Sequence, residues 1–155
     1  MSHPMIVYTQ QASTISIEDI LAQMRARGVP VEWHYRLLSE RGHPDNWTAG
    51  YFLPEGRSQP QVTLAKEVVQ AYLREEVLQA YADVLTESQR QALLTAQTRY
   101  QLASYQTPDA ERERMLVHVV HILADLGDGL ILDIDAEQFY DRHSYPARHA
   151  RLLGT

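Results

Sequence analysis

Residues 107–140 read TPDAERERMLVHVVHILADLGDGLILDIDAEQFY and are the part of the chain that decides the fold. Apolar residues recur there at helical spacing and form one stripe, made of Leu116, Val119, Val120, Leu123 and Leu126. We expect Gly127 to end this helix and Asp128-Gly129 to turn the chain into a buried strand at 130–134. The stretch therefore predicts a long amphipathic helix that packs on a sheet.

The same order of strand, helix, glycine and strand occurs upstream, at residues 5–38. Right-handed crossovers would place the helices of the two β-α-β units, 5–38 and 99–134, on one face of a shared sheet. We therefore predict an α+β fold close to a ferredoxin-like sandwich. It has two β-α-β units that share a mixed or antiparallel sheet, helices packed on one face, and a central two-helix insertion.

We expect a single α+β domain over residues 1–155. Its predicted segments are a strand-helix-strand-strand unit at 5–53, helices at 63–96, a strand-helix-strand unit at 99–140 and a frayed tail at 141–155. Strands at 31–38 and 47–53 should form a hairpin. Within 63–96, one helix is expected to run from Thr63 to about Val84, and a second to begin at Thr86 with Gln89 in the capping-box position.

The composition excludes several classes of function. With 14 Lys plus Arg against 20 Asp plus Glu, the net charge of −6 argues against nonspecific binding to nucleic acid. The absence of cysteine excludes a disulfide framework, a zinc-thiolate site and a cysteine nucleophile. The N-terminus does not resemble a secretory signal, and no apolar run approaches the ~20 residues of a membrane helix. We expect a cytoplasmic, soluble protein that needs no cofactor and no membrane.

Two histidines on the long helix are candidates for a metal site. His118 and His121 are three residues apart, so their rings project from neighbouring turns. A third ligand would come from Asp125, one turn further on, or from His143. The sequence HVVH lacks the glutamate and the spacing of a zinc-protease helix. The alternative is that both histidines border the apolar stripe without binding a metal.

The strand LILDIDAE resembles the first motif of the haloacid-dehalogenase phosphatases, with Asp133 in the place of the nucleophile and Asp135 in that of the acid/base. Glu137 stands where that family has threonine or valine, and only 20 residues follow Asp135, too few for the core that the family builds after the motif. We therefore expect the two carboxylates to be solvated at a strand end.

A candidate binding site lies around the predicted hairpin. Its residues are Trp33, His34, Arg41, His43, Asp45 and Trp47. Exposed tryptophan and arginine side chains anchor many interfaces, so the loop at 39–46 could serve recognition. The alternative is that the aromatic residues are core.

A candidate interface with a second copy of the chain involves Val69, Tyr72 and Leu73. Apolar residues cover more than one side of a continuous helix at 63–84, so one side would need a partner, and a two-fold dimer is the commonest solution. The alternative is that the helix is sandwiched inside one domain.

Two functions remain open at the level of the sequence. The first is a non-enzymatic, bacterial-type binding or regulatory module that associates with a protein partner or a small ligand, by analogy with inhibitor and immunity proteins. The second is a metal-dependent hydrolase that uses His118, His121 and a nearby aspartate.

Overall fold

The computed structural model describes residues 3–10, 15–41, 45–59, 61–104 and 110–154. It is an α+β fold with one seven-stranded antiparallel sheet and six α-helices in the described residues. The elements in chain order are β1 (His3–Thr9), α1 (Ile17–Ala26), β2 (Val31–Tyr35), a 3-10 turn (Leu38–Glu40), β3 (Ala49–Pro54), β4 (Val62–Val68), α2 (Ala71–Ala80), α3 (Glu87–Thr95), β5 (Thr98–Ser104), α4 (Ala110–Gly127), β6 (Leu130–Asp133), β7 (Gln138–Tyr140), α5 (Ser144–Arg148) and α6 (Ala150–Leu153).

The strand order is β2-β3-β4-β5-β1-β6-β7, and every neighbouring pair is antiparallel. The predicted hairpin of β2 and β3 is confirmed. β5 and β6 run parallel to each other on either side of β1, so the β5-α4-β6 unit crosses over the N-terminal strand. β1 and β2 are also parallel, but three strands separate them. The ferredoxin-like arrangement is not confirmed, because the sheet has seven strands.

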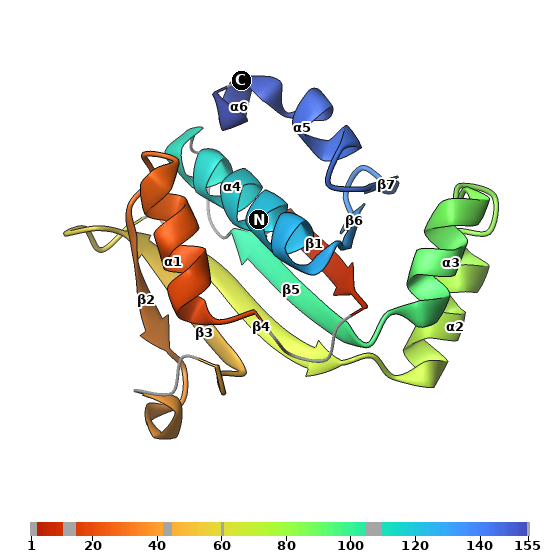
Figure 1. Ribbon diagram of the computed structural model, residues 1–155, viewed down its shortest axis with the longest axis horizontal. Coiled ribbons are helices and arrows are strands. Elements are labelled where there is room, and N and C mark those ends of the chain that lie inside the picture. Colours follow the sequence, from red (N-terminus) through yellow and green to blue (C-terminus); the bar gives the residue numbers. More distant parts are fainter. Residues whose placement is uncertain (1–2, 11–14, 42–44, 60, 105–109, 155) are drawn as a thin grey trace.

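Helix α4 is the centre of the larger core. Eleven of its 18 residues are buried, because it contacts the sheet on one side and α1 and α6 on others. Figure 1 shows α1 and α4 side by side over the sheet, as the two-crossover prediction required. Gly127, the last residue of α4, allows a close approach to β1, since a Cβ there would lie 2.6 Å from Cγ2 of Thr9.

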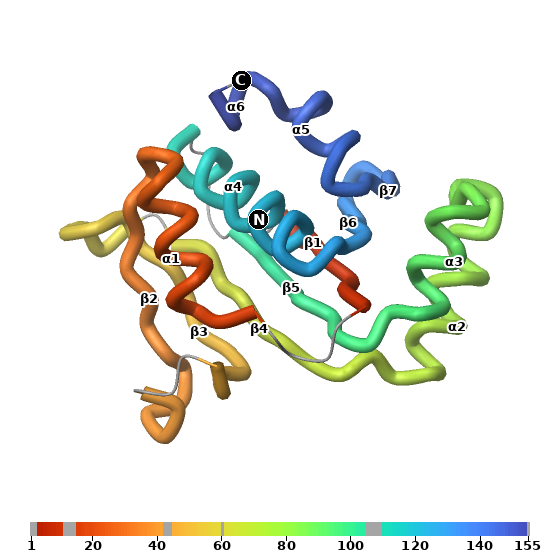
Figure 2. The backbone as a smooth tube through the Cα atoms, viewed as in Figure 1, coloured from red at the N-terminus to blue at the C-terminus, as the bar shows by residue number. Residues whose placement is uncertain are grey.

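The two helices of the central insertion do not share the face of α1 and α4. Helices α2 and α3 cover the opposite face of the sheet, over β1, β6 and β7. There Leu78 and Leu93 pack on Ile6, Tyr8 and Leu132. The capping box that starts α3 is confirmed, with the Thr86 side chain accepting from Gln89 N and the Gln89 side chain accepting from Thr86 N. Figure 2 shows this helical pair standing apart from α1 and α4.

Two further predictions need correction. Residues 62–68 form strand β4 and not the first turns of a helix from Thr63 to Val84, because Val62 and Leu64 alternate with partly exposed Thr63 and pair with β3 and β5. The tail at 141–155 is not frayed over its described part: α5 and α6 fold back onto α4, and Tyr145 is fully buried among core residues. In the described residues, no helix is long and apolar enough to cross a membrane.

Gly50 allows the closest contact between β2 and β3. A Cβ at this position would lie 2.3 Å from the carbonyl oxygen of His34 and 2.4 Å from Cζ2 of Trp33. A side chain larger than hydrogen would therefore push the two strands apart and displace the Trp33 ring from the core.

We expect Gly50→Ala to lower the free energy of unfolding by about 2 kcal/mol, because backbone and ring must both shift. Gly56→Ala is the matched control. Its Cβ would meet nothing within 4 Å, so only the cost of a left-handed residue, about 1 kcal/mol, should be lost. Urea denaturation of both variants measures the difference, and equal losses would contradict the close contact at Gly50.

Candidate functional site

The face of the sheet opposite α4 is left uncovered over β3, β4 and β5, and a groove lies there. Its residues follow from the register. One cross-strand row contains Ala49, Ala65, Gln101 and Ile6, and the next contains Tyr51, Thr63, Ala103 and Pro4. The hydrogen bond from Arg36 N to Ala49 O, 2.9 Å, extends the first row to the end of β2. We call this hollow the open-face groove; its volume is about 530 Å³.

Small side chains make the floor of the open-face groove. Ala49, Thr63, Ala65 and Ala103 are neighbours on three adjacent strands, and each is only partly buried. Larger residues stand around them, with Arg36 and Tyr51 on the side of β2 and β3, and Ile6 and Ile134 on the side of β1 and β6. The groove exists because the residues in the middle of this face are smaller than those around them.

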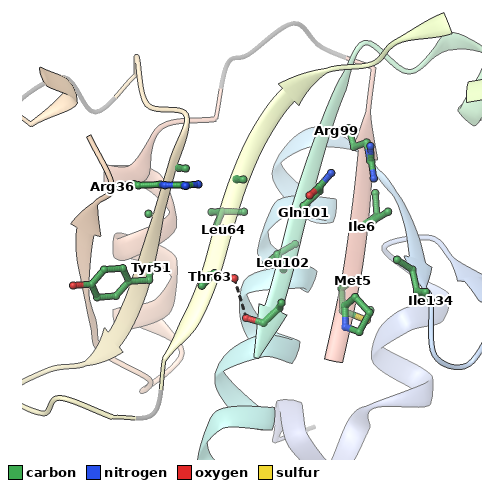
Figure 3. A pocket seen from close by; sticks show the side chains of 15 residues that line it. Met5, Ile6, Arg36, Tyr51, Thr63, Leu64, Arg99, Gln101, Leu102 and Ile134 are labelled. Carbon is green, nitrogen blue, oxygen red and sulfur yellow. Dashed lines mark hydrogen bonds between the residues drawn. The ribbon is translucent and has the colours of Figure 1, made fainter. Parts of the chain in front are cut away.

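The charged groups that line the groove are cationic. Arg36 and Arg99 are the only charged residues in its lining, within the part of the chain that the structure describes. Arg99 Nη1 donates to Glu67 Oε1 over 2.9 Å, and Gln101 Nε2 donates to the same oxygen over 2.9 Å. Figure 3 shows Arg36 extending from the end of β2 across β3 towards the floor, with Arg99 and Gln101 on the far side.

The lining offers binding groups but few groups that transfer protons. It contains no histidine, carboxylate, lysine or cysteine among the described residues, and a guanidinium group only donates hydrogen bonds. The Thr63 hydroxyl already donates to the carbonyl oxygen of Ala103, 3.3 Å away. This set of residues suits recognition of a ligand better than acid–base chemistry.

The open-face groove was not predicted from the sequence. A strand was predicted at 47–53, but β4 was taken for a helix, so the floor residues Thr63 and Ala65 were placed on the wrong kind of element. The signal that could have found it is the run of small residues on the outward positions of three successive strands. That signal becomes visible only when the strand order is known.

The aromatic residues predicted around the hairpin are mainly core. Trp47 is 1% exposed and its Nε1 donates to Ile15 O over 3.1 Å, so it does not stand at the rim of a loop. Trp33 packs between Trp47, Phe52 and Tyr35. His34 faces the other way and stacks on Tyr51, at the edge of the groove, with 5.1 Å between ring centroids.

The loop residues of that predicted site are not gathered with them. Arg41 and Asp45 are exposed, and His43 lies outside the described residues. Instead, the turn is held by Glu40, whose buried carboxylate accepts from Thr48 N over 2.9 Å and from Thr48 Oγ1 over 2.6 Å. Of the predicted binding residues, His34 therefore lies next to the open-face groove, because it contacts Tyr51.

The predicted interface residues lie just before α2 and in its first turn. Val69 packs on the smaller core, Leu73 is half-buried, and Tyr72 is 66% exposed. A partner was predicted because apolar residues would cover two sides of one continuous helix, whereas residues 62–80 form a strand followed by a shorter helix. Dimer formation through these residues stays a prediction that the single chain does not test.

The two histidines of α4 meet at Arg27, the residue that ends α1. Arg27 Nη1 donates to Nδ1 of His121 over 2.9 Å and to Nδ1 of His118 over 3.4 Å. A guanidinium only donates, so both rings must present a lone pair and be neutral. Nε2 of His121 then carries the proton and donates to Arg142 O, 3.3 Å away.

A cation thus occupies the space where a metal-bound pair would place its ion, while Asp125 is exposed. Among the described residues, no group of three or more histidines or carboxylates is arranged to hold a metal ion. Burial, followed by the charge of Arg27, lowers the pKa of His118 to about 4 and lowers that of His121. The geometry therefore favours a structural role for this pair.

We expect Arg27→Gln to raise the pKa of His121, because the variant removes a neighbouring positive charge. Titration of the imidazole resonances by NMR measures this shift. In the wild type both histidines should titrate below 6.5, so the stability they contribute is present above 6.5 and is lost as the pH falls towards about 4.

Arg25→Gln is the matched control, since Arg25 is exposed on α1 and lies 3.9 Å from Glu55. It should leave the titration of His121 unchanged. If Arg27→Gln also leaves it unchanged, the inferred contact between the guanidinium and the rings is wrong.

A second polar cluster joins three elements that are far apart in the sequence. His3 lies between two carboxylates, with Nδ1 3.1 Å from Glu113 Oε2 and Nε2 3.4 Å from Asp133 Oδ1. Both ring nitrogens face acceptors, so His3 is an imidazolium. Its hydrogen bonds to Asp133 and Glu113 raise its pKa to about 10. The cluster ties the start of β1 to α4 and to the end of β6.

This cluster corrects the expectation that Asp133 is solvated, because that residue is buried. Burial alone would raise the pKa of Asp133, but the hydrogen bonds from His3 and from Ala136 N outweigh it and lower the pKa. Asp133 was singled out from the sequence, but His3 and Glu113 were not. His3 and Glu113 are 110 residues apart in the chain, and no local sequence pattern links them.

We expect His3→Gln to destabilise the protein more near pH 6 than near pH 9. Because the folded pKa of His3 is raised, its contribution is fully present below the ordinary value of 6.5 and is lost as the pH rises towards about 10. Thermal unfolding at several pH values measures the difference from the wild type. His143→Gln, at an exposed position, is the control. A loss that does not vary with pH would show that His3 is not held as an imidazolium.

Comparisons of the chain with models of protein families, with curated proteins and with solved structures find no match.

Proposed function

We propose that this protein is a non-enzymatic binding module that holds a small amphipathic molecule in the open-face groove. The observation that carries the proposal is the hollow of four small side chains at the centre of an uncovered sheet face. Its volume of about 530 Å³ falls within the roughly 300–1,000 Å³ of small-molecule sites. The apolar floor and the few polar groups around it match the usual character of such sites.

A protein partner is the second candidate. Leu37 and Leu38 follow Arg36 directly and are exposed, Leu38 by 76%. Exposed leucines next to an arginine are typical of a contact surface for another protein. These leucines do not line the groove, so filling the groove tests the first candidate without altering the second.

The test is a titration with the fluorescent dye anilinonaphthalene sulfonate, which has an apolar ring system and a polar group. Ala65→Leu should weaken binding by about tenfold or more, because the added side chain occupies the middle of the floor and a bulky residue excludes the dye. Ala136→Leu, at an exposed turn position, is the matched control and should bind as the wild type does.

A second measurement covers the case in which Ala65→Leu does not fold. Amide resonances of the wild type are followed by NMR during the titration, and those of Ala49, Ala65 and Ala103 should shift most. If the folded variant binds the dye as tightly as the wild type, or if the shifts lie elsewhere, the groove is not the binding site. The surface around Leu37 and Leu38 would then be the stronger candidate.

A further inference from the structure

The uncovered face shows an imbalance of charge at one end. The chain carries a net charge of −6, yet both charged residues that line the open-face groove are arginines. Arg99 is neutralised by Glu67, at 2.9 Å. Arg36 makes no ion pair with any residue in the described part of the chain, so its positive charge is available to a ligand.

The carboxylates near Arg36 are directed elsewhere. Glu32, on the same face of β2, is four residues away, or about 13 Å along the strand, and lies 3.7 Å from Nε2 of His34. Glu40 is buried and its carboxylate is engaged by Thr48. The neighbouring strand β3, AGYFLP, has no charged residue. The unpaired charge of Arg36 therefore belongs to the groove and not to a surface ion pair.

The position of Arg36 relative to the floor is fixed by the backbone. Its amide donates to Ala49 O over 2.9 Å, so the residue continues the pairing of β2 with β3. From there the side chain extends across β3 in the direction of β4 (Figure 3). These two strands carry the floor residues Ala49 and Ala65. A guanidinium in this place can donate two parallel hydrogen bonds to a carboxylate, sulfonate or phosphate group.

We propose that the ligand of the open-face groove is an amphipathic anion whose acidic group is bound by Arg36 and whose apolar part lies on the alanine floor. This inference rests on the proposed function and specifies the ligand class for the same site. Arg99 is the weaker candidate for the acidic group, because it lies about 14 Å away across three strand spacings and already faces Glu67.

The experiment uses two dyes that share one ring skeleton. Anilinonaphthalene sulfonate carries a sulfonate, and N-phenyl-naphthylamine is the same molecule without it. Arg36→Gln should weaken binding of the anionic dye by about tenfold, because a charge-assisted pair is lost, and should leave the neutral dye unaffected. Arg25→Gln, on the opposite face of the sheet, is the matched control and should change neither affinity.

Displacement of the bound dye then separates the sources of negative charge. Dodecanoate tests a carboxylate and dodecyl phosphate tests a phosphate, with dodecanol as the neutral comparison. Stronger displacement by either anion than by the alcohol, lost in Arg36→Gln, supports the proposal and identifies the headgroup. Equal displacement by all three, or an unchanged anionic dye affinity in Arg36→Gln, overturns it.

The two proposals fail in different ways. If Ala65→Leu abolishes binding of both dyes but Arg36→Gln affects neither, the groove binds a ligand and only the anionic character is wrong. If Ala65→Leu affects neither dye, the groove itself is not the site, whatever Arg36 does.

Discussion

The burial of helix α4 is the constraint on which the rest of the structure depends. Eleven of its 18 residues are buried, in contact with the sheet, α1 and the C-terminal helices. A helix with apolar residues on most of its circumference must be covered on several sides. The chain supplies this cover on one face of the sheet, which leaves only the short helices α2 and α3 for the other. The open-face groove follows from this unequal distribution.

Residues of helix α4 take part in two histidine clusters with opposite charge states. His3 is protonated at Glu113 because carboxylates face both of its nitrogens. His118 is neutral because it is buried and faces the guanidinium group of Arg27. The identity of the neighbours, and not the residue type, decides the charge. In both clusters the partners come from distant segments, so each also fixes the position of α4 against β1 or α1.

Local signals in the sequence were sufficient for the elements that lie near one another in the chain. The capping box at Thr86 and the turn from α4 into β6 rest on contacts a few residues apart, and β2 and β3 are consecutive strands that pair as a hairpin. Strand β4 was lost because Leu64 and Val68 are spaced as on a helix and Thr63 resembles a cap, whereas pairing with β3 and β5 decides the outcome. The sheet order, and with it the groove, depends on such long-range pairing.

The composition of the groove floor gives an independent reason to regard it as a built site. A sheet face that only meets water usually carries charged or β-branched residues, since these are solvated or favour the strand conformation. Ala49, Ala65 and Ala103 do neither, and alanine is disfavoured in strands. Leaving a sheet face both uncovered and lined by alanine costs stability on two counts.

The strands that form this face, β3, β4 and β5, are well packed on their other side, through Phe52, Leu64 and Leu102. The protein therefore has enough core beneath these strands to tolerate a floor that contributes little to stability, and the space above that floor is the feature that such residues provide.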